Sequence, residues 1–261
     1  MRMVAIHDRD QIEMFLNKSN TDNYFYHCNN LEGRFWENTQ WYGLTINGEL
    51  KAIAMFILKY DIPVLLASSY RSDHSYQKEL VKKLQPFLPK RIYCHFDLDS
   101  ANDLFDQTNH IQINPYKNMK LPSIDSVHDF DLDDVQQLGK KDKKEIISFL
   151  KDSHPDHFVD EEFIDQGYYF GIKHHNDLIS LAGVVAKSEQ YSVVSIGNVA
   201  THPQYRKRNL ASKTVSALIR NLHPIYRTIT LNVKEANAPA INCYKKLGFI
   251  ETGTFEEVIF I

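Results

Sequence analysis

A basic segment of the chain follows a run of β-forming residues. Residues 192–201 are rich in Val, Ile and Thr, Pro203 marks a turn, and Arg206, Lys207 and Arg208 come just before a helical pattern. The N-terminus of a helix carries partial positive charge and exposes N–H groups that have no partner within the helix. A tight loop that enters such a helix is therefore suited to bind a pyrophosphate. For this segment alone, a basic helix start on a solvated face is the simpler interpretation.

A second segment places a tyrosine on a short helix. Residues 228–233 predict a buried strand, and residues 237–247 predict a helix that Gly248 ends, as glycine commonly does. Ala240 and Tyr244 are four residues apart and so share one face of this helix. A tyrosine in such a position is usually a core residue with a hydrogen-bonded hydroxyl. This segment alone therefore does not indicate a function.

Taken together, the two segments resemble the signature of the GNAT superfamily of acyl-CoA N-acyltransferases. In that signature an Arg/Gln-x-x-Gly-x-Gly/Ala loop precedes one helix, and an Asn-x-x-Ala-x-x-x-Tyr-x-x-x-Gly-Phe stretch follows the next strand. The matching positions are Arg206, Asn209, Ala211, Asn237, Ala240, Tyr244, Gly248 and Phe249. The lead-in 197–203 is similar to the glycine N-acyltransferase-like branch. Asn209 replaces the family's loop glycine and Lys207 stands where glycine is frequent; asparagine is one of the few other residues that readily adopt left-handed backbone angles.

The resemblance implies acetyl-CoA, or another acyl-CoA, as cosubstrate. The backbone at residues 199–201 would pair with the pantetheine arm, amides of residues 207–212 would bind the pyrophosphate, and Tyr244 would face the thioester sulfur as the catalytic acid. A phenol with a pKa near 10 can protonate a departing thiolate with a pKa of about 8.5. The predicted cofactor-binding residues are Val199, Ala200, Thr201, Arg206, Lys207, Arg208, Asn209, Leu210, Ala211, Ser212, Asn237 and Ala240.

A general base is not evident. Many relatives place a glutamate on the strand before the loop, whereas this chain has Ser195 there. Glu161, Glu162 and Glu189 are the other candidates, and each fits a solvated surface charge better. We therefore assign no base.

Three functions are compatible with these residues. The first is an N-acetyltransferase, or N-acyltransferase, that moves an acetyl or short acyl group from acyl-CoA to a primary amine of a small molecule or peptide. The second, which Asn209 and Ser195 favour, is a catalytically inactive protein that binds acyl-CoA and regulates a partner. The third, a tRNA-dependent aminoacyl transferase, needs a basic face, and the net charge of -3 argues against it.

The two halves of the chain have similar patterns. The first half predicts helices at 11–17 and 22–31, strands at 41–46 and 50–59 joined by Asn47-Gly48, a strand at 63–68, a helix at 75–88 and a strand at 91–96. The second half predicts helices at 141–151 and 161–166 and a hairpin through 174–177. At an offset of 128 (178 − 50) the aligned pairs are Gly43/Gly171, Leu44/Ile172, Glu49/Asp177, Leu50/Leu178 and Ala54/Ala182.

This repeat predicts an α/β (α+β) fold of two tandem GNAT-like domains, each a mixed, mostly antiparallel central sheet flanked by helices. Residues 1–120 would form a degenerate domain without the cofactor motif, and residues 128–261 the acyl-CoA-binding domain. The segment 113–126, with Pro115 and Pro122, is the predicted linker.

Composition narrows the class of protein further. Hydrophobic residues make up 43% and charged residues 24%, which is typical of a globular protein that buries a core. The longest apolar run, 52–58, is far below the roughly 20 residues of a membrane helix, and no signal peptide is evident. We expect a cytoplasmic protein with no nucleic-acid or membrane partner, and we allow for a homodimer.

No metal site is predicted. The three cysteines, Cys28, Cys94 and Cys243, are widely spaced and fit reduced thiols. Cys243 is expected to fill the core rather than act as a nucleophile. His154 and His157 lie in an acidic stretch that fits a solvated loop better than a zinc site.

Overall fold

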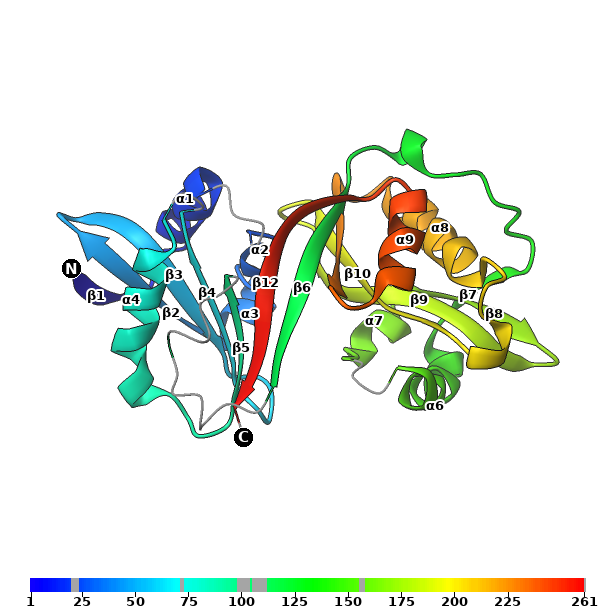
Figure 1. The fold of residues 1–261 in the computed structure, drawn as a ribbon, viewed down its shortest axis with the longest axis horizontal. Helices are drawn as coiled ribbons and strands as arrows, with labels where there is room; N and C mark the ends of the chain where they lie inside the picture. The colour runs from blue at the N-terminus through cyan, green and yellow to red at the C-terminus, as the bar shows by residue number, and fades with distance from the viewer. Residues whose placement is uncertain (20–23, 71–72, 98–103, 105–111, 155–157, 261) are drawn as a thin grey trace. The chain divides into compact units, whose positions relative to one another are not determined.

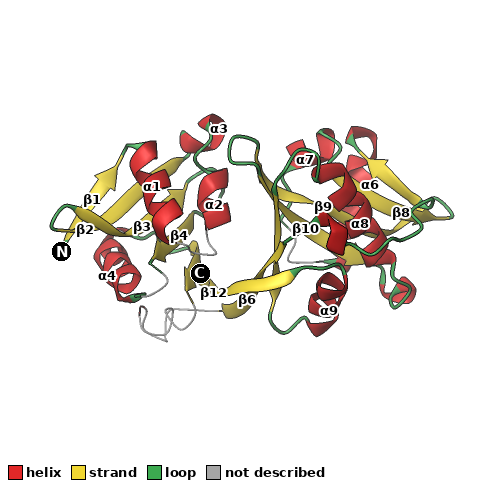
Figure 2. Ribbon diagram, turned by 90° about the horizontal axis from the view of Figure 1, so that it is seen from above, coloured by secondary structure: helices red, strands yellow, loops and turns green. Residues whose placement is uncertain are grey.

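The computed structural model describes residues 1–19, 24–70, 73–97, 104, 112–154 and 158–260, which fold as two compact units. Unit 1 comprises Met1–Asn118, Lys234–Ala236 and Thr252–Ile261, and unit 2 comprises Met119–Val233 and Asn237–Glu251. Each unit has a mixed, mostly antiparallel sheet with helices on both faces (Figures 1 and 2). The predicted fold class is confirmed.

Unit 1 has the strand order β1-β2-β3-β4-β5-β12, in which only β4 and β5 pair in parallel among the pairs whose register the structure gives. Figure 2 shows α1 and α2 on one side of this sheet and α4 on the other. The elements are β1 Arg2–Ile6, α1 Arg9–Ser19, α2 Tyr24–Asn29, α3 Gly33–Trp36, β2 Thr39–Ile46, β3 Glu49–Ile57, β4 Val64–Ser69, α4 Ser75–Leu84, β5 Ile92–Asp97 and β12 Ile250–Phe260.

The strand order continues as β6-β11-β10-β9-β8-β7, with β10 and β11 parallel. β6 begins in unit 1 and ends in unit 2, which starts at Met119, and the other strands of this series lie in unit 2 apart from Lys234 at the end of β11. Figure 1 shows α8 and α9 on one side of the sheet and α6 and α7 on the other. The elements are β6 Gln112–Leu121, β7 Val135–Leu138, α6 Lys143–Ser153, α7 Glu161–Asp165, β8 Tyr169–His174, β9 Asp177–Ser188, β10 Val193–Thr201, α8 Leu210–Leu222, β11 Thr228–Lys234 and α9 Ala238–Lys246.

The β2–β3 and β8–β9 hairpins match residue for residue at the predicted offset of 128. Gly43 lies opposite Ile53 in the first hairpin, and Gly171 lies opposite Leu181 in the second. The register shifts between Leu44 and Thr45 and again at the equivalent step between Ile172 and Lys173. Both turns have two residues with positive φ, 50° and 82° at 47–48 and 49° and 72° at 175–176, which suits the right-handed twist of hairpin strands. The sequence repeat therefore reflects a structural one.

The division of the chain differs from the predicted domains in two places. Residues 252–261 belong to unit 1, because β12 pairs with β5 from Phe255 opposite Asp97 to Phe260 opposite Ile92. The predicted linker 113–126 is also wrong over most of its length, since residues 112–121 form β6. Pro115 fits in this strand because proline lacks only the donor: its carbonyl accepts a hydrogen bond from Glu235 N at 2.9 Å.

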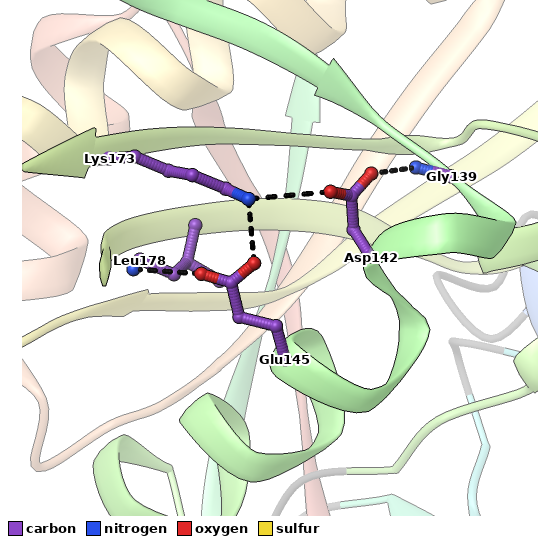
Figure 3. Close-up of polar contacts among 5 residues, drawn as sticks. All are labelled: Gly139, Asp142, Glu145, Lys173 and Leu178. Atoms are coloured by element: carbon purple, nitrogen blue, oxygen red, sulfur yellow. Dashed lines mark hydrogen bonds and ion pairs between the residues drawn. The ribbon is translucent and has the colours of Figure 1, made fainter. Parts of the chain in front are cut away.

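An ion-pair network fixes the β8–β9 hairpin to the start of α6 (Figure 3). Lys173 Nζ lies 2.6 Å from Glu145 Oε2 and 3.3 Å from Asp142 Oδ1. The second oxygens of the two carboxylates accept backbone N–H groups, Glu145 from Leu178 and Asp142 from Gly139. Every carboxylate oxygen in the network thus has a partner, and the pKa of Lys173 is raised, chiefly by its hydrogen bond to Glu145.

None of the helices in the described part of the chain is long and apolar enough to span a membrane.

Candidate active site

The loop before α8 has the backbone conformation of a glycine loop without containing glycine. Lys207 has φ 64°, and Asn209, which is the N-cap of α8, has φ 58° and ψ 15°. Both values lie in the left-handed region that glycine adopts most easily. The helical hydrogen bonds begin with Lys213 N donating to Asn209 O at 3.0 Å, so the amides of residues 210–212 precede the first such bond. These amides lie where the pyrophosphate is predicted to bind.

Arg206 connects this loop to the end of β10. Its Nε donates to the carbonyl of Thr201 at 3.2 Å, and the Thr201 hydroxyl lies 3.0 Å from Ser180 Oγ. Arg208 has its guanidinium 5.3 Å from the ring centroid of Tyr205. Of the three predicted cations, Arg206 therefore has a structural partner, while Lys207 and Arg208 are exposed on the loop.

The strands β10 and β11 pair over only part of their length. Their register runs from Val193 opposite Thr228 to Ile196 opposite Leu231, although β10 continues to Thr201. On its other edge, β10 has a bulge between Gly197 and Ala200, where three steps along β10 match two steps along β9. The predicted pantetheine-binding residues 199–201 lie in this last part of β10, past the end of the parallel pairing.

Asn198 is the bulged residue and was not predicted as part of the site. It has φ 51°, is buried, and its Nδ2 donates to Phe158 O and to the Tyr169 hydroxyl, each at 2.8 Å. The bulge is thus connected to the segment between α6 and α7. An asparagine in a strand that is rich in β-branched residues is the sequence signal that points to it.

The helix α9 carries the other predicted residues. Asn237 caps the helix, and its Oδ1 accepts a hydrogen bond from Ala240 N at 3.2 Å. The cap does not use the N–H groups of the Asn237 carboxamide. Tyr244 is 7% exposed, and burial raises its pKa above the ordinary value.

The first turn of α8 lies against α9. Ser212 Oγ and Cys243 Sγ are 3.3 Å apart, and Val199, Ala240 and Cys243 pack on the core cluster that contains Tyr244. Burial raises the pKa of Cys243, which keeps it a thiol and fits the prediction that it fills the core. The structure therefore places the first turn of α8 against α9, and both helices pack on the same core as Val199 of β10.

The comparisons with known proteins agree with this geometry. Residues 134–249 match the Acetyltransferase (GNAT) family, a span that includes the loop before α8, all of β10 and all of α9. This part of the chain is similar to the GNAT acetyltransferases. No curated protein sequence matches the chain.

Solved structures share the fold of the whole chain. A Drosophila protein has a TM-score of 0.73 at 14% identity, covering 99% of this chain and 98% of its own. A GNAT-family acetyltransferase from Colwellia psychrerythraea has a TM-score of 0.61 at 12% identity, with 100% of both chains covered. A tandem GNAT protein from the clavulanic acid biosynthesis pathway has a TM-score of 0.55 at 11% identity, covering 99% and 97%. The similarity to the glycine N-acyltransferase-like branch remains a prediction.

The region that matches the GNAT family has no carboxylate at the position where a base is expected. Ser195 is buried in β10. Lys143 pairs with Glu161, Gln166 binds Glu162, and Lys187 pairs with Glu189, all on the surface. None of these three glutamates lies among the site residues described above.

No metal site is apparent in the described residues, where no group of three or more His, Cys, Asp or Glu side chains could hold an ion. His157, part of the acidic stretch considered above, lies outside the described residues.

Unit 1 also has a pair of parallel strands that separate before their ends. Its parallel strands β4 and β5 pair only from Val64 opposite Tyr93 to Leu66 opposite His95, while β4 continues to Ser69. Next to the end of this pairing, the buried Gln77 side chain donates from Nε2 to Ala67 O at 2.7 Å. The Gln77 side chain thus occupies the Ala67 carbonyl, which lies next to the point where β4 and β5 separate.

Proposed function

We propose that the GNAT domain transfers an acetyl or other short acyl group from acyl-CoA to a primary amine of a small molecule or peptide. The observation that supports this most is the left-handed backbone at Lys207 and Asn209, because the loop keeps a phosphate-binding conformation despite its sequence. This conformation answers one of the two arguments for an inactive protein, the absence of the loop glycine, while Ser195, the other argument, stands unchanged.

The residues present fit an acyl-CoA. Past the pairing of β10 with β11, the backbone of residues 199–201 can take hydrogen bonds from an extended pantetheine arm, as an added strand would. The amides at the start of α8, with Lys207 and Arg208 beside them, suit the pyrophosphate. The N–H groups of Asn237 provide a further donor toward the pantetheine region.

The transfer itself is direct. The amine nitrogen attacks the thioester carbonyl, the carbon–sulfur bond breaks, and the proton of the Tyr244 hydroxyl passes to the departing sulfur. Tyr244 is protonated at neutral pH, as an ordinary tyrosine is, and so holds a proton to donate; burial raises its pKa and thereby makes it a weaker acid before the substrate binds. No carboxylate base is part of the proposal, so the acceptor must react as the neutral amine and its excess proton passes to water.

The test combines binding and turnover. Acetyl-CoA should raise the thermal unfolding temperature of the wild-type chain, and free thiol should be released with at least one member of a panel of primary amines. Tyr244→Phe should lower kcat about a hundredfold, the usual contribution of a positioned acid, while the stabilisation by acetyl-CoA is retained. Tyr226→Phe, a buried tyrosine of the same unit, is the matched control and should keep its activity. Binding of acetyl-CoA without release of thiol for any amine would contradict the proposal.

A further inference from the structure

Asn198 has a backbone conformation that is unusual for its place in the fold. Seven residues other than glycine have positive φ in the described part of the chain, and six of them lie in turns or loops. Asn198, with φ 51°, is the exception, because it lies inside the strand β10. Such backbone angles persist only where the surrounding structure holds them, and they cluster at functional sites. The angle at Asn198 therefore needs a cause in the structure around it.

The carboxamide of Asn198 supplies that cause. Nδ2 carries two N–H groups and donates to the carbonyl of Phe158 and to the hydroxyl of Tyr169, each at 2.8 Å. Asn198 and Tyr169 are both buried, so the bond between their side chains is shielded from water. Burial raises the pKa of Tyr169 to about 12, which keeps this hydroxyl neutral at physiological pH. Both N–H groups of the side chain are thus used, and their bonds hold the left-handed angle in place.

The two bonds connect β10 to the segment between α6 and α7. Residues 158–160 of this segment precede α7, and the Phe158 side chain is 45% exposed although its carbonyl is bound at the bulge. The residue after Asn198 is Val199, which packs on the core cluster that contains Tyr244. Asn198 therefore lies between Phe158 and the predicted pantetheine-binding residues 199–201.

The two faces of this sheet have different places in the proposed function. The predicted cofactor-binding residues lie on β10, on the loop before α8, and at the starts of α8 and α9. Figure 1 shows α8 and α9 on one side of the sheet and α6 and α7 on the other, and none of the predicted cofactor-binding residues lies on α6 or α7. An amine can thus approach the thioester from the side on which Phe158 lies.

We propose that Asn198 is a positioning residue for the acyl transfer. Its carboxamide holds residues 199–201, and the acyl group bound along them, in a fixed place relative to the segment at Phe158 that the amine passes. This inference rests on the proposed function, because without bound acyl-CoA there is no acyl group to position. Reacting groups must be held within about 0.5 Å of the productive geometry, so loss of the carboxamide lowers turnover and leaves cofactor binding intact.

Steady-state kinetics with an amine that wild type acylates, together with isothermal titration with acetyl-CoA, test this role. Asn198→Gly permits the left-handed angle but removes both hydrogen bonds, and it should lower kcat about ten- to a hundredfold with the Kd for acetyl-CoA unchanged. Tyr169→Phe removes one of the two acceptors and should cause a smaller loss of kcat. The matched control is Asn176→Gly, the same substitution at φ 72° in the exposed β8–β9 turn, and it should keep the kcat of wild type.

A double variant separates positioning from a general loss of stability. Asn198→Gly already breaks the bond to Tyr169, so adding Tyr169→Phe should lower kcat no further. Losses of kcat that multiply in the double variant would overturn the inference, since the two side chains would then act independently. Where Asn198→Gly does not fold, Tyr169→Phe decides alone, and an unchanged kcat in that variant overturns the inference.

The remaining outcomes distinguish this inference from the proposed function. Wild type that releases no thiol with any amine overturns the proposed function, and the role of Asn198 with it. Active wild type together with a folded Asn198→Gly variant of unchanged kcat overturns the role of Asn198 alone. A Kd for acetyl-CoA that rises as much as kcat falls also overturns that role, because the side chain would then act through the cofactor site.

Discussion

Unit 1 is predicted to lose stability in mild acid because it buries neutral histidines. His27 is fully buried, neither of its ring nitrogens has a hydrogen-bond partner in the described part of the chain, and burial lowers its pKa from 6.5 to about 3. His95 is buried as well, and burial, together with the charge that His27 would carry, lowers its pKa to about 3. Both histidines are therefore neutral in the folded chain at every pH above about 3.

The sign and size of the effect follow from proton linkage. Well above pH 6.5 both histidines are neutral in the folded and in the unfolded state, so they do not reduce the free energy of unfolding. As the pH falls below 6.5 the unfolded chain takes up protons that the folded chain cannot, and stability falls down to about pH 3. At pH 5 each histidine is 1.5 units below its unfolded pKa, which amounts to about 2 kcal/mol each and about 4 kcal/mol for both.

Tryptophan fluorescence can follow this loss in unit 1 alone. Both tryptophans of the chain, Trp36 and Trp41, are in unit 1, and the ring of Trp41 lies 5.7 Å from that of His27. Urea unfolding should show a loss of about 4 kcal/mol in wild type between pH 7.5 and pH 5, but only about 2 kcal/mol in His27→Leu. The exposed His7→Gln should behave as wild type.

Comparison of wild type with His27→Leu at each pH removes other titrating groups from the result. Burial raises the pKa of Glu257, and that carboxyl changes stability in the opposite direction, since its folded form holds a proton more strongly. Glu257 is present in both proteins and cancels in the difference. If the two proteins lose the same unfolding free energy between pH 7.5 and pH 5, the reasoning from buried neutral histidines is wrong.

Two further predictions concern backbone angles. Asn209→Val should weaken CoA binding several-fold, because the left-handed backbone costs a β-branched residue roughly 1–2 kcal/mol. Asn209→Gly should leave the Kd for CoA unchanged, and equal Kd values for the two variants would contradict this reasoning. Gly248→Ala should lower the free energy of unfolding by about 2 kcal/mol, because φ is 88° and the new Cβ would collide with Ser126. Gly33→Ala, which adds a methyl group in open space, should change the free energy of unfolding little. Chemical denaturation measures both variants.

The local features of the fold could be predicted from the sequence. Asn47-Gly48 and the hydrophobic alternation around it specify the first hairpin, and the offset of 128 transfers that register to the second hairpin, including its bulge. The helix predicted at 11–17 lies within α1, and the helix predicted at 75–88 ends as α4 at Leu84, followed by a 3₁₀ turn at Gln85–Phe87. These features depend on neighbouring residues, which the sequence shows directly.

Features that depend on distant residues could not be predicted. Pro115 is typical of a linker, but its segment is a strand because β11 and β12, which are distant in the sequence, lie on either side of it. The side-chain bonds of Asn198 join residues up to 40 positions away, so its place at the bulge was missed. In the same way, the motif predicts Asn237 and Tyr244 as site residues, but no motif points to residues 125–130, which line one cavity together with Asn209 and Ser212.

The pairing of β12 with β5 has a consequence for biosynthesis. The paired segments are 158 residues apart (255 − 97), so the N-terminal sheet cannot acquire its last strand until unit 2 has been translated. Until then β5 presents an open edge, and open edges are sites of wrong pairing during folding. The unit that is made first on the ribosome is therefore the one that is completed last, and a chain shortened at its C-terminus would be damaged at its beginning.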